Sequence, residues 1–202
     1  MGIIAADLFL TLDGVYQAPG GIDEDPSGGF EHGGWQAGFP GQDAGETILA
    51  NIAKIDALLL GRKTYDIFAS YWPGHGDSDP IAERFNRIPK FVVSRELVDP
   101  TWAGTTVLRD AASAGRLRDD FNEVHLIGSG DLLNSLLEAD VVDRLNLWLH
   151  PLTLGSGKRL FGTGTLPAAF RLTEPPRGFE GGSVSLVYER AGDVVTGNID
   201  DI

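Results

Sequence analysis

The stretch Leu58-Leu59-Leu60-Gly61-Arg62-Lys63-Thr64-Tyr65 joins a short apolar run directly to a helical segment. Residues 57–60 predict a buried strand, and residues 63–71 predict a helix that ends before Pro73. A glycine at the carboxyl end of a strand lets the backbone approach a ligand closely. The helix start that follows offers free N–H groups and a positive dipole. The stretch therefore predicts an anion-binding turn; a plain strand–helix turn capped by Thr64 is the alternative.

Outward from this unit, the chain alternates apolar strands with amphipathic helices. The pattern predicts strands at 3–10, 57–60, 90–94, 105–108, 123–127, 143–150 and 183–189, and helices at 46–55, 63–71 and 131–138. Such alternation is typical of a parallel sheet, whereas the strands that predominate near the end favour antiparallel closure. We predict an α/β fold: a central mixed, mostly parallel sheet of about eight strands flanked by helices, with antiparallel C-terminal strands.

Two further turns repeat the arrangement of the first. Ile127-Gly128-Ser129-Gly130-Asp131-Leu132 again joins a strand through glycines to a helix, which would let a pyrophosphate approach the helix amides. This G-x-G is only part of the dinucleotide fingerprint, so a helix start capped by Asp131 is an equal alternative. Val93-Ser94-Arg95 ends a strand with a hydroxyl and a guanidinium, the groups that a ribose 2′-phosphate needs. Here the alternative is a surface arginine leaving a strand.

Composition limits the function. The chain of 202 residues has no cysteine, which excludes disulfides, thiolate metal sites and cysteine nucleophiles. Its four histidines show no metal-ligand spacing, so we expect no metal site. The formal net charge of −13 argues against nucleic acid and anionic membranes as partners. The N-terminus lacks the basic region of a signal peptide and no apolar run could span a bilayer, so we expect a cytoplasmic protein.

The order of the three turns resembles the dihydrofolate reductase fold, closest to the C-terminal reductase domain of the bifunctional riboflavin-biosynthesis deaminase-reductase. Two further motifs support the resemblance: Thr11-Leu12-Asp13-Gly14 after the first strand, and 142–151 with Leu154-Gly155-Ser156-Gly157-Lys158-Arg159-Leu160-Phe161 late in the chain. Because no deaminase signature precedes this segment, the sequence predicts a stand-alone member. We expect a single reductase domain over 1–191 and an acidic C-terminal tail over 192–202.

The resemblance implies roles for particular residues. Gly61, Arg62, Lys63 and Thr64 would bind the pyrophosphate and neighbouring phosphate of NADPH, and Ser94 and Arg95 its 2′-phosphate. Gly128, Ser129, Gly130 and Leu132 would line the pyrophosphate and nicotinamide, with Ala6, Asp13 and Gly14 beside the nicotinamide. The implied function is an NADPH-dependent reductase that transfers a hydride to a small heterocyclic or carbonyl substrate. A non-catalytic nucleotide-binding protein of the same fold is the alternative. The family also implies a homodimer.

The glycine- and proline-rich segment 19–45 predicts a long loop, which we expect to close over the nicotinamide as a lid. Trp35 in this loop is the candidate substrate contact, with an anchoring role as the alternative. Dihydrofolate reductase itself places an acid on the helix after this loop. Among the six acids here, Asp43 is the candidate catalytic residue, although a helix-favouring charge at a helix start is the plainer reading.

Overall fold

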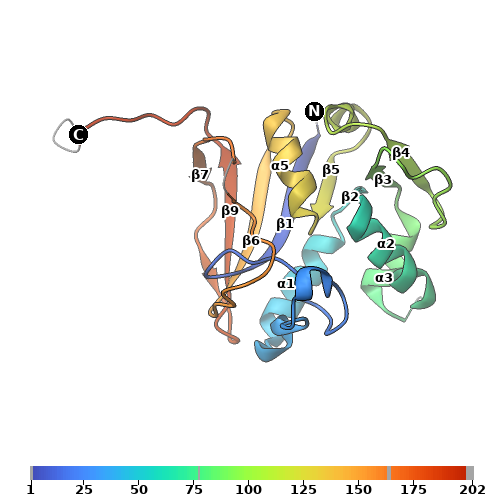
Figure 1. Cartoon of the computed structure of the whole chain (residues 1–202), viewed down its shortest axis with the longest axis horizontal. Helices are drawn as coiled ribbons and strands as arrows, with labels where there is room; N and C mark the ends of the chain where they lie inside the picture. Colours follow the sequence, from blue (N-terminus) through green and yellow to red (C-terminus); the bar gives the residue numbers. More distant parts are fainter. Residues whose placement is uncertain (1, 77, 163–164, 199–202) are drawn as a thin grey trace.

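The computed structural model describes residues 2–76, 78–162 and 165–198, and over these ranges it forms one nine-stranded sheet flanked by helices (Figure 1). The strand order is β4-β3-β2-β5-β1-β6-β9-β7, and β8 pairs with β9. The strands are β1 (Ile3–Thr11), β2 (Ala57–Gly61), β3 (Lys90–Val93), β4 (Thr105–Leu108), β5 (Glu123–Ile127), β6 (Arg144–His150), β7 (Phe170–Leu172), β8 (Arg177–Gly178) and β9 (Val184–Arg190).

Strand direction confirms the mixed sheet that the sequence predicts. β1 pairs in parallel with both β5 and β6, and β2, β3 and β4 continue the parallel part on one side. β9 pairs antiparallel with β6, β7 and β8. The carboxyl ends of β2, β3 and β5 therefore meet at one edge of the sheet, which is where α/β sheets bind ligands.

Helices cover both faces of the sheet, because the parallel strands are apolar on both sides. The α-helices are α1 (Gln42–Ile52), α2 (Arg62–Tyr71), α3 (Pro80–Arg87), α4 (Leu117–Asp120) and α5 (Gly130–Glu138). Leu59 of β2 joins the core that packs against α4 and α5, while Leu58 and Leu60 join the core against α2 and α3. Figure 1 shows α5 in front of the sheet and the α2–α3 pair beside β2 and β3.

Several element boundaries differ from the prediction. The helix α3 was not predicted, although Asp79 accepts hydrogen bonds from the N–H groups of Ile81 and Ala82 and Pro80 occupies the first helical position. This aspartate–proline pair is a local helix-start signal. The helix α1 begins at Gln42, four residues before the predicted start. The strands β7 and β8 were also not predicted, because strands of three and two residues are too short to show an alternating pattern.

The C-terminal segment leaves the sheet after β9. Residues 192–198 of the predicted tail are exposed and have neither helix nor strand, and its residues 199–202 lie outside the described part. Among the described helices, none has the length and apolar character required to cross a bilayer.

Candidate functional site

A cleft of about 1480 Å³ opens at the carboxyl edge of the sheet, between α1 and the α2–α3 pair, and extends toward the start of α5. All ten residues predicted on the three turns line it: Gly61, Arg62, Lys63, Thr64, Ser94, Arg95, Gly128, Ser129, Gly130 and Leu132. The structure thus brings together segments up to about 70 residues apart in the chain, because the ends of parallel strands meet at one sheet edge.

Two helix N-termini point into this cleft without a side-chain cap. The helix α2 starts after Gly61 and α5 starts after Ser129, and within the described ranges no side chain makes a capping hydrogen bond at either start. The first N–H groups of a helix have no partner inside the helix, so both starts present donors to the cleft. Two such starts side by side suit an anion with more than one phosphate.

Ser129 joins the two turns. Its hydroxyl accepts a 3.0 Å hydrogen bond from the N–H of Gly61 and donates to the hydroxyl of Thr64 over 2.8 Å. Ser129 has a φ of 55°, a conformation that residues with a side chain adopt rarely. The neighbouring Gly130 is required for another reason, since a Cβ there would lie 2.4 Å from the ring of Tyr16.

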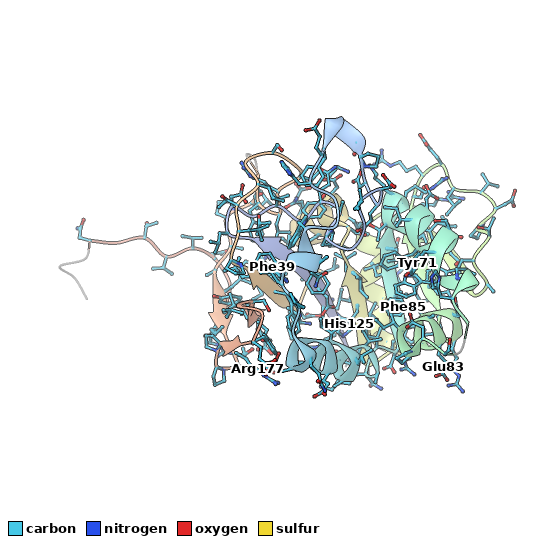
Figure 2. The ribbon with its side chains drawn as sticks, turned by 90° about the horizontal axis from the view of Figure 1, so that it is seen from below. Phe39, Tyr71, Glu83, Phe85, His125 and Arg177 are labelled. Atoms are coloured by element: carbon cyan, nitrogen blue, oxygen red, sulfur yellow. The ribbon has the colours of Figure 1, made fainter. Side chains whose placement is uncertain are left out.

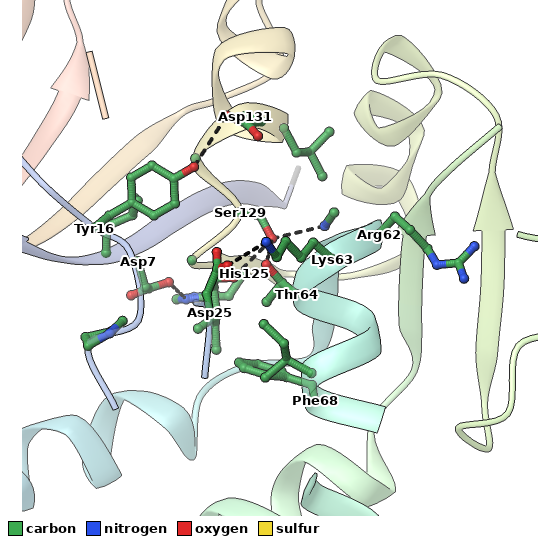
Figure 3. Close-up of a pocket in the computed structure, with 18 of the residues that line it drawn as sticks. Asp7, Tyr16, Asp25, Arg62, Lys63, Thr64, Phe68, His125, Ser129 and Asp131 are labelled. Atoms are coloured by element: carbon green, nitrogen blue, oxygen red, sulfur yellow. Dashed lines mark hydrogen bonds and ion pairs between the residues drawn. The ribbon is translucent and has the colours of Figure 1, made fainter. Parts of the chain in front are cut away.

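The third turn contributes Arg95 to the cleft. The buried Ser94 hydroxyl accepts hydrogen bonds from the N–H groups of Glu96 and Leu97, which curls the chain so that the exposed Arg95 lines the cleft. Arg109 holds this turn by donating to the carbonyls of residues 94, 95 and 97. Arg62 pairs with Asp66 and extends toward β3 and β4, away from the cleft floor (Figure 3).

Lys63 contacts the long loop rather than open solvent. Its ammonium lies 2.5 Å from the Asp25 carboxylate, which also accepts a 2.9 Å hydrogen bond from Lys158. Burial by itself would raise the pKa of Asp25, but the hydrogen bonds from Lys63, Ser27 and Lys158 lower it well below its usual range. The Asp25 carboxylate thus lies where Lys63 was expected to meet a phosphate, and a bound anion would compete with it for Lys63.

Three residues predicted beside the nicotinamide do not line the cleft. Ala6 is fully buried in the core between β5 and β6. The Asp13 carboxylate accepts hydrogen bonds from the Thr11 hydroxyl, the amides of Leu154 and Gly155, and Arg159. The Thr11 hydroxyl is the main reason that the pKa of Asp13 lies well below its usual range. Asp13 and Gly14 therefore hold the loop 152–160 in place. The motif at 11–14 and the motif at 154–161, which both support the resemblance, contact each other.

Trp35 also lies away from the cleft. Its side chain is 8% exposed, its indole N–H donates 2.8 Å to the carbonyl of Gln17, and its ring packs edge-on against His150. Together with Val15 and Phe30 it forms a small separate core under the loop. This geometry fits the alternative role of Trp35 as an anchor of the loop, because the apolar side chains of the loop pack against one another. The part of the loop that does line the cleft is 19–21, 23–25 and Gln36.

The candidate acid Asp43 is not in the cleft either. It lies in the first turn of α1, where its carboxylate accepts hydrogen bonds from the amides of Ala44 and Glu180. This is the helix-favouring role at a helix N-terminus. The side chains of α1 that face the cleft are Ile48, Asn51 and Ile52.

Two titratable groups that were not predicted as site residues lie at the cleft floor, Asp7 and His125. Figure 2 shows His125 between α1 and the α2–α3 pair, with Tyr71 and Phe85 on the α2–α3 side. The sequence does carry a signal for both residues. Asp7 and His125 each place an ionisable side chain in an otherwise apolar strand that would be buried. Apolar walls above a polar floor are typical of a small-molecule site.

These residues fit a dinucleotide such as NADPH. Two uncapped helix starts supply N–H donors for a pyrophosphate, and Ser129 with the glycines Gly61 and Gly128 lets the ligand approach the backbone. Arg95 and the Ser94 hydroxyl, at the end of β3, would hold a further phosphate. The cleft is large enough to take a second small molecule over Asp7 and His125.

The chain is similar to known proteins over part or most of its length. Residues 115–177 match the RibD C-terminal domain family. The Bacillus subtilis protein YyaP, itself uncharacterised, is 27% identical over 92% of this chain and 93% of its own length.

Two solved structures share the fold. A Shewanella sp. PV-4 protein named as a candidate riboflavin biosynthesis protein superposes with a TM-score of 0.68 at 21% identity, covering 93% of this chain and 98% of its own. A pyrimidine reductase-like protein from Corynebacterium diphtheriae gives a TM-score of 0.62 at 13% identity, with 95% and 93% covered. Residues 115–177 are thus similar to the RibD C-terminal domain family, and the chain shares the fold of these two solved proteins over nearly its whole length.

Proposed function

We infer that this protein is an NADPH-dependent reductase that acts on a small heterocyclic or carbonyl substrate. The observation that carries the proposal is the convergence of three strand-end turns and two uncapped helix starts on one cleft. The similarity of residues 115–177 to the RibD C-terminal domain family, and the pyrimidine reductase-like protein that shares the fold, support the same chemistry.

Different residues of the chain would bind the cofactor and surround the substrate. The helix starts at Gly61 and Ser129 bind the phosphates, and Arg95 adds a charge-assisted hydrogen bond to the terminal phosphate. NADPH bound in this way supplies the hydride. Ile48, Ile52 and Phe68 give the cleft apolar walls, which exclude water and orient a flat substrate against the floor.

Titration of NADPH into the protein, followed by fluorescence, tests the first half of the proposal. Lys63→Ala should weaken binding, whereas Arg87→Ala, an equal change of net charge on α3, should not. Thermal melting of both variants shows whether the loss of the Lys63–Asp25 pair has unfolded the loop. A wild-type chain that does not bind NADPH would end the proposal.

A panel of pterins, pyrimidines and simple carbonyl compounds tests the second half through loss of NADPH absorbance. Oxidation of NADPH with one class of compound identifies the substrate class. Tight binding with no oxidation by any of them would favour the alternative, a non-catalytic nucleotide-binding protein of the same fold.

A further inference from the structure

Five polar side chains from three adjacent strands form a continuous network, which reaches the cleft floor through Asp7 and His125. His125 Nδ1 lies 2.5 Å from Oδ2 of Asp7, and His125 Nε2 lies 3.0 Å from Oε2 of Glu123. Arg144 donates 2.7 Å to the same Glu123 oxygen, and Asn146 donates 2.9 Å to Oδ1 of Asp7. The strands β5, β1 and β6 are neighbours, and these side chains share the face that looks toward α1.

The geometry sets the protonation of His125. Both ring nitrogens face carboxylate oxygens, and an ionised carboxylate can only accept a hydrogen bond, so both nitrogens must carry a proton. Burial by itself would lower the pKa of His125, but Asp7 and then Glu123 raise it above its usual value. Two carboxylates, one imidazolium and the Arg144 guanidinium leave the network neutral.

Charged and polar groups reach His125 from each neighbouring strand. They are Asp7 from β1, Glu123 from β5, and Arg144 and Asn146 from β6. On the β2 side, Leu58 is the apolar neighbour of His125, and Asp56, just before β2, accepts hydrogen bonds from the amides of residues 122 and 123.

Access to this network is one-sided. The side chain of His125 is 4% exposed, whereas that of Asp7 is 22% exposed, and both line the cleft (Figure 3). The backbone places Asp7 next to the cofactor turn, because its carbonyl accepts a 3.1 Å hydrogen bond from the N–H of Gly128. A proton held by His125 can therefore reach a molecule in the cleft through the Asp7 carboxyl.

We propose that Asp7 and His125 are the proton-donating pair of this reductase, and that the substrate presents a ring nitrogen or carbonyl oxygen to Asp7. The proposal rests on the proposed reductase function. The reducible C=N or C=O gains a hydride at carbon as its π bond breaks. The Nδ1 proton of His125 passes to the Asp7 carboxylate, which passes a proton on to the substrate nitrogen or oxygen and is left ionised, as before. The imidazole is left neutral and regains a proton from solvent after the product leaves.

Three variants test the pair with a substrate that the wild-type protein reduces. Asp7→Asn, which keeps the shape of the side chain, should slow NADPH oxidation by about 100-fold or more and leave NADPH affinity unchanged. Glu123→Gln should move the alkaline limb of the pH–rate profile to lower pH, because it removes a charge that holds the proton on His125. His32→Gln removes an exposed imidazole outside the cleft and should change neither rate nor profile.

A second readout does not need turnover. NMR titration of the imidazole signals of the free protein should show His125 protonated above the usual histidine pKa, and less so in Asp7→Asn. A His125 that is neutral at neutral pH would overturn the pair even if the reductase function holds. An Asp7→Asn enzyme of wild-type rate and pH profile would also overturn it. A raised His125 pKa in a protein that does not bind NADPH would instead refute the proposed function alone.

Discussion

The N–H of Gly61 donates a 3.0 Å hydrogen bond to the hydroxyl of Ser129, and this contact joins the turn after β2 to the turn after β5. The two strands are neighbours in the sheet, so the turns lie side by side although 68 residues separate the partners. The bond sets the distance between two helix N-termini that both face the cleft. It also holds Ser129 in its left-handed conformation.

Replacing Ser129 tests whether this contact organises the cofactor site. Ser129→Ala removes the hydroxyl but keeps a side chain at a positive φ, and should destabilise the protein by about 1–3 kcal/mol. Ser129→Gly also loses the hydroxyl but relieves the backbone, so it should cost less. Both variants should bind NADPH more weakly than wild type, measured by fluorescence beside urea unfolding. Unchanged NADPH affinity in both would separate the contact from the cofactor site.

Arg95 should set the preference for NADPH over NADH. A charge-assisted hydrogen bond to a 2′-phosphate contributes about 1.5–3 kcal/mol, so NADPH should bind at least about tenfold more tightly. Arg95→Ala should remove most of this ratio, whereas Arg171→Ala, an exposed arginine on β7, should leave it intact. Parallel titrations with both cofactors measure the ratio. Equal affinities in wild type would contradict the assignment.

Trp35→Ala should destabilise the protein rather than impair the substrate site. The indole is buried against His150 and donates to the Gln17 carbonyl, so removing it leaves a cavity and an unpaired acceptor. Loss of a buried aromatic side chain typically costs about 3–5 kcal/mol. Trp35→Phe, which retains a ring, should cost less in the same urea titration. Lost turnover at unchanged stability would instead return Trp35 to the role of a substrate contact.

Lys90 should make stability rise with pH on the alkaline side. Its ammonium is buried, donates to the carbonyls of Phe85 and Asn86, and lies 4.6 Å from the Trp102 ring centroid. Burial lowers the pKa of Lys90 to about 8, from 10.5. Between these values the unfolded chain binds a proton that the folded protein has released, so the free energy of unfolding increases with pH.

The size of this effect is of the order of 1–3 kcal/mol across that pH window. Urea unfolding at several pH values measures it as the difference between wild type and Lys90→Met, which lacks the titrating group. If the difference in unfolding free energy between wild type and Lys90→Met stays the same between pH 8 and pH 10.5, Lys90 is not desolvated.

We also expect a homodimer in solution, through the sheet face that carries Leu172, Leu186 and Tyr188. Leu172 is exposed, Leu186 and Tyr188 are only partly buried, and Figure 1 shows β9 and β7 extending beyond α5. Leu186→Glu should shift the mass measured by light scattering toward that of a monomer. Val195→Glu, in the exposed C-terminal segment, should not. A wild-type monomer at micromolar concentration would contradict the expectation.

The sequence alone was enough to predict most of the strands and helices, and the edge of the sheet where the cleft lies. Apolar periodicity is a local property, and a glycine turn between a strand and a helix is read within a few residues. Parallel strands end at a common edge, so three turns such as that at Gly61 could be assigned to one site without knowing the strand order. All ten residues predicted on those turns line the cleft.

The side chains that line the cleft from outside these three turns could be identified only from the tertiary structure. Asp7 and His125 lie 118 residues apart and meet because β5 and β1 are neighbours. Trp35 and Asp43 belong to a long loop and the helix start that follows it, where hydrogen bonds to distant backbone and contacts with other loop side chains set each position. Such contacts have no sequence period, since they depend on how the loop packs. Local sequence pattern therefore predicted the edge of the sheet where the cleft lies, and the packing of distant segments set which side chains form its floor.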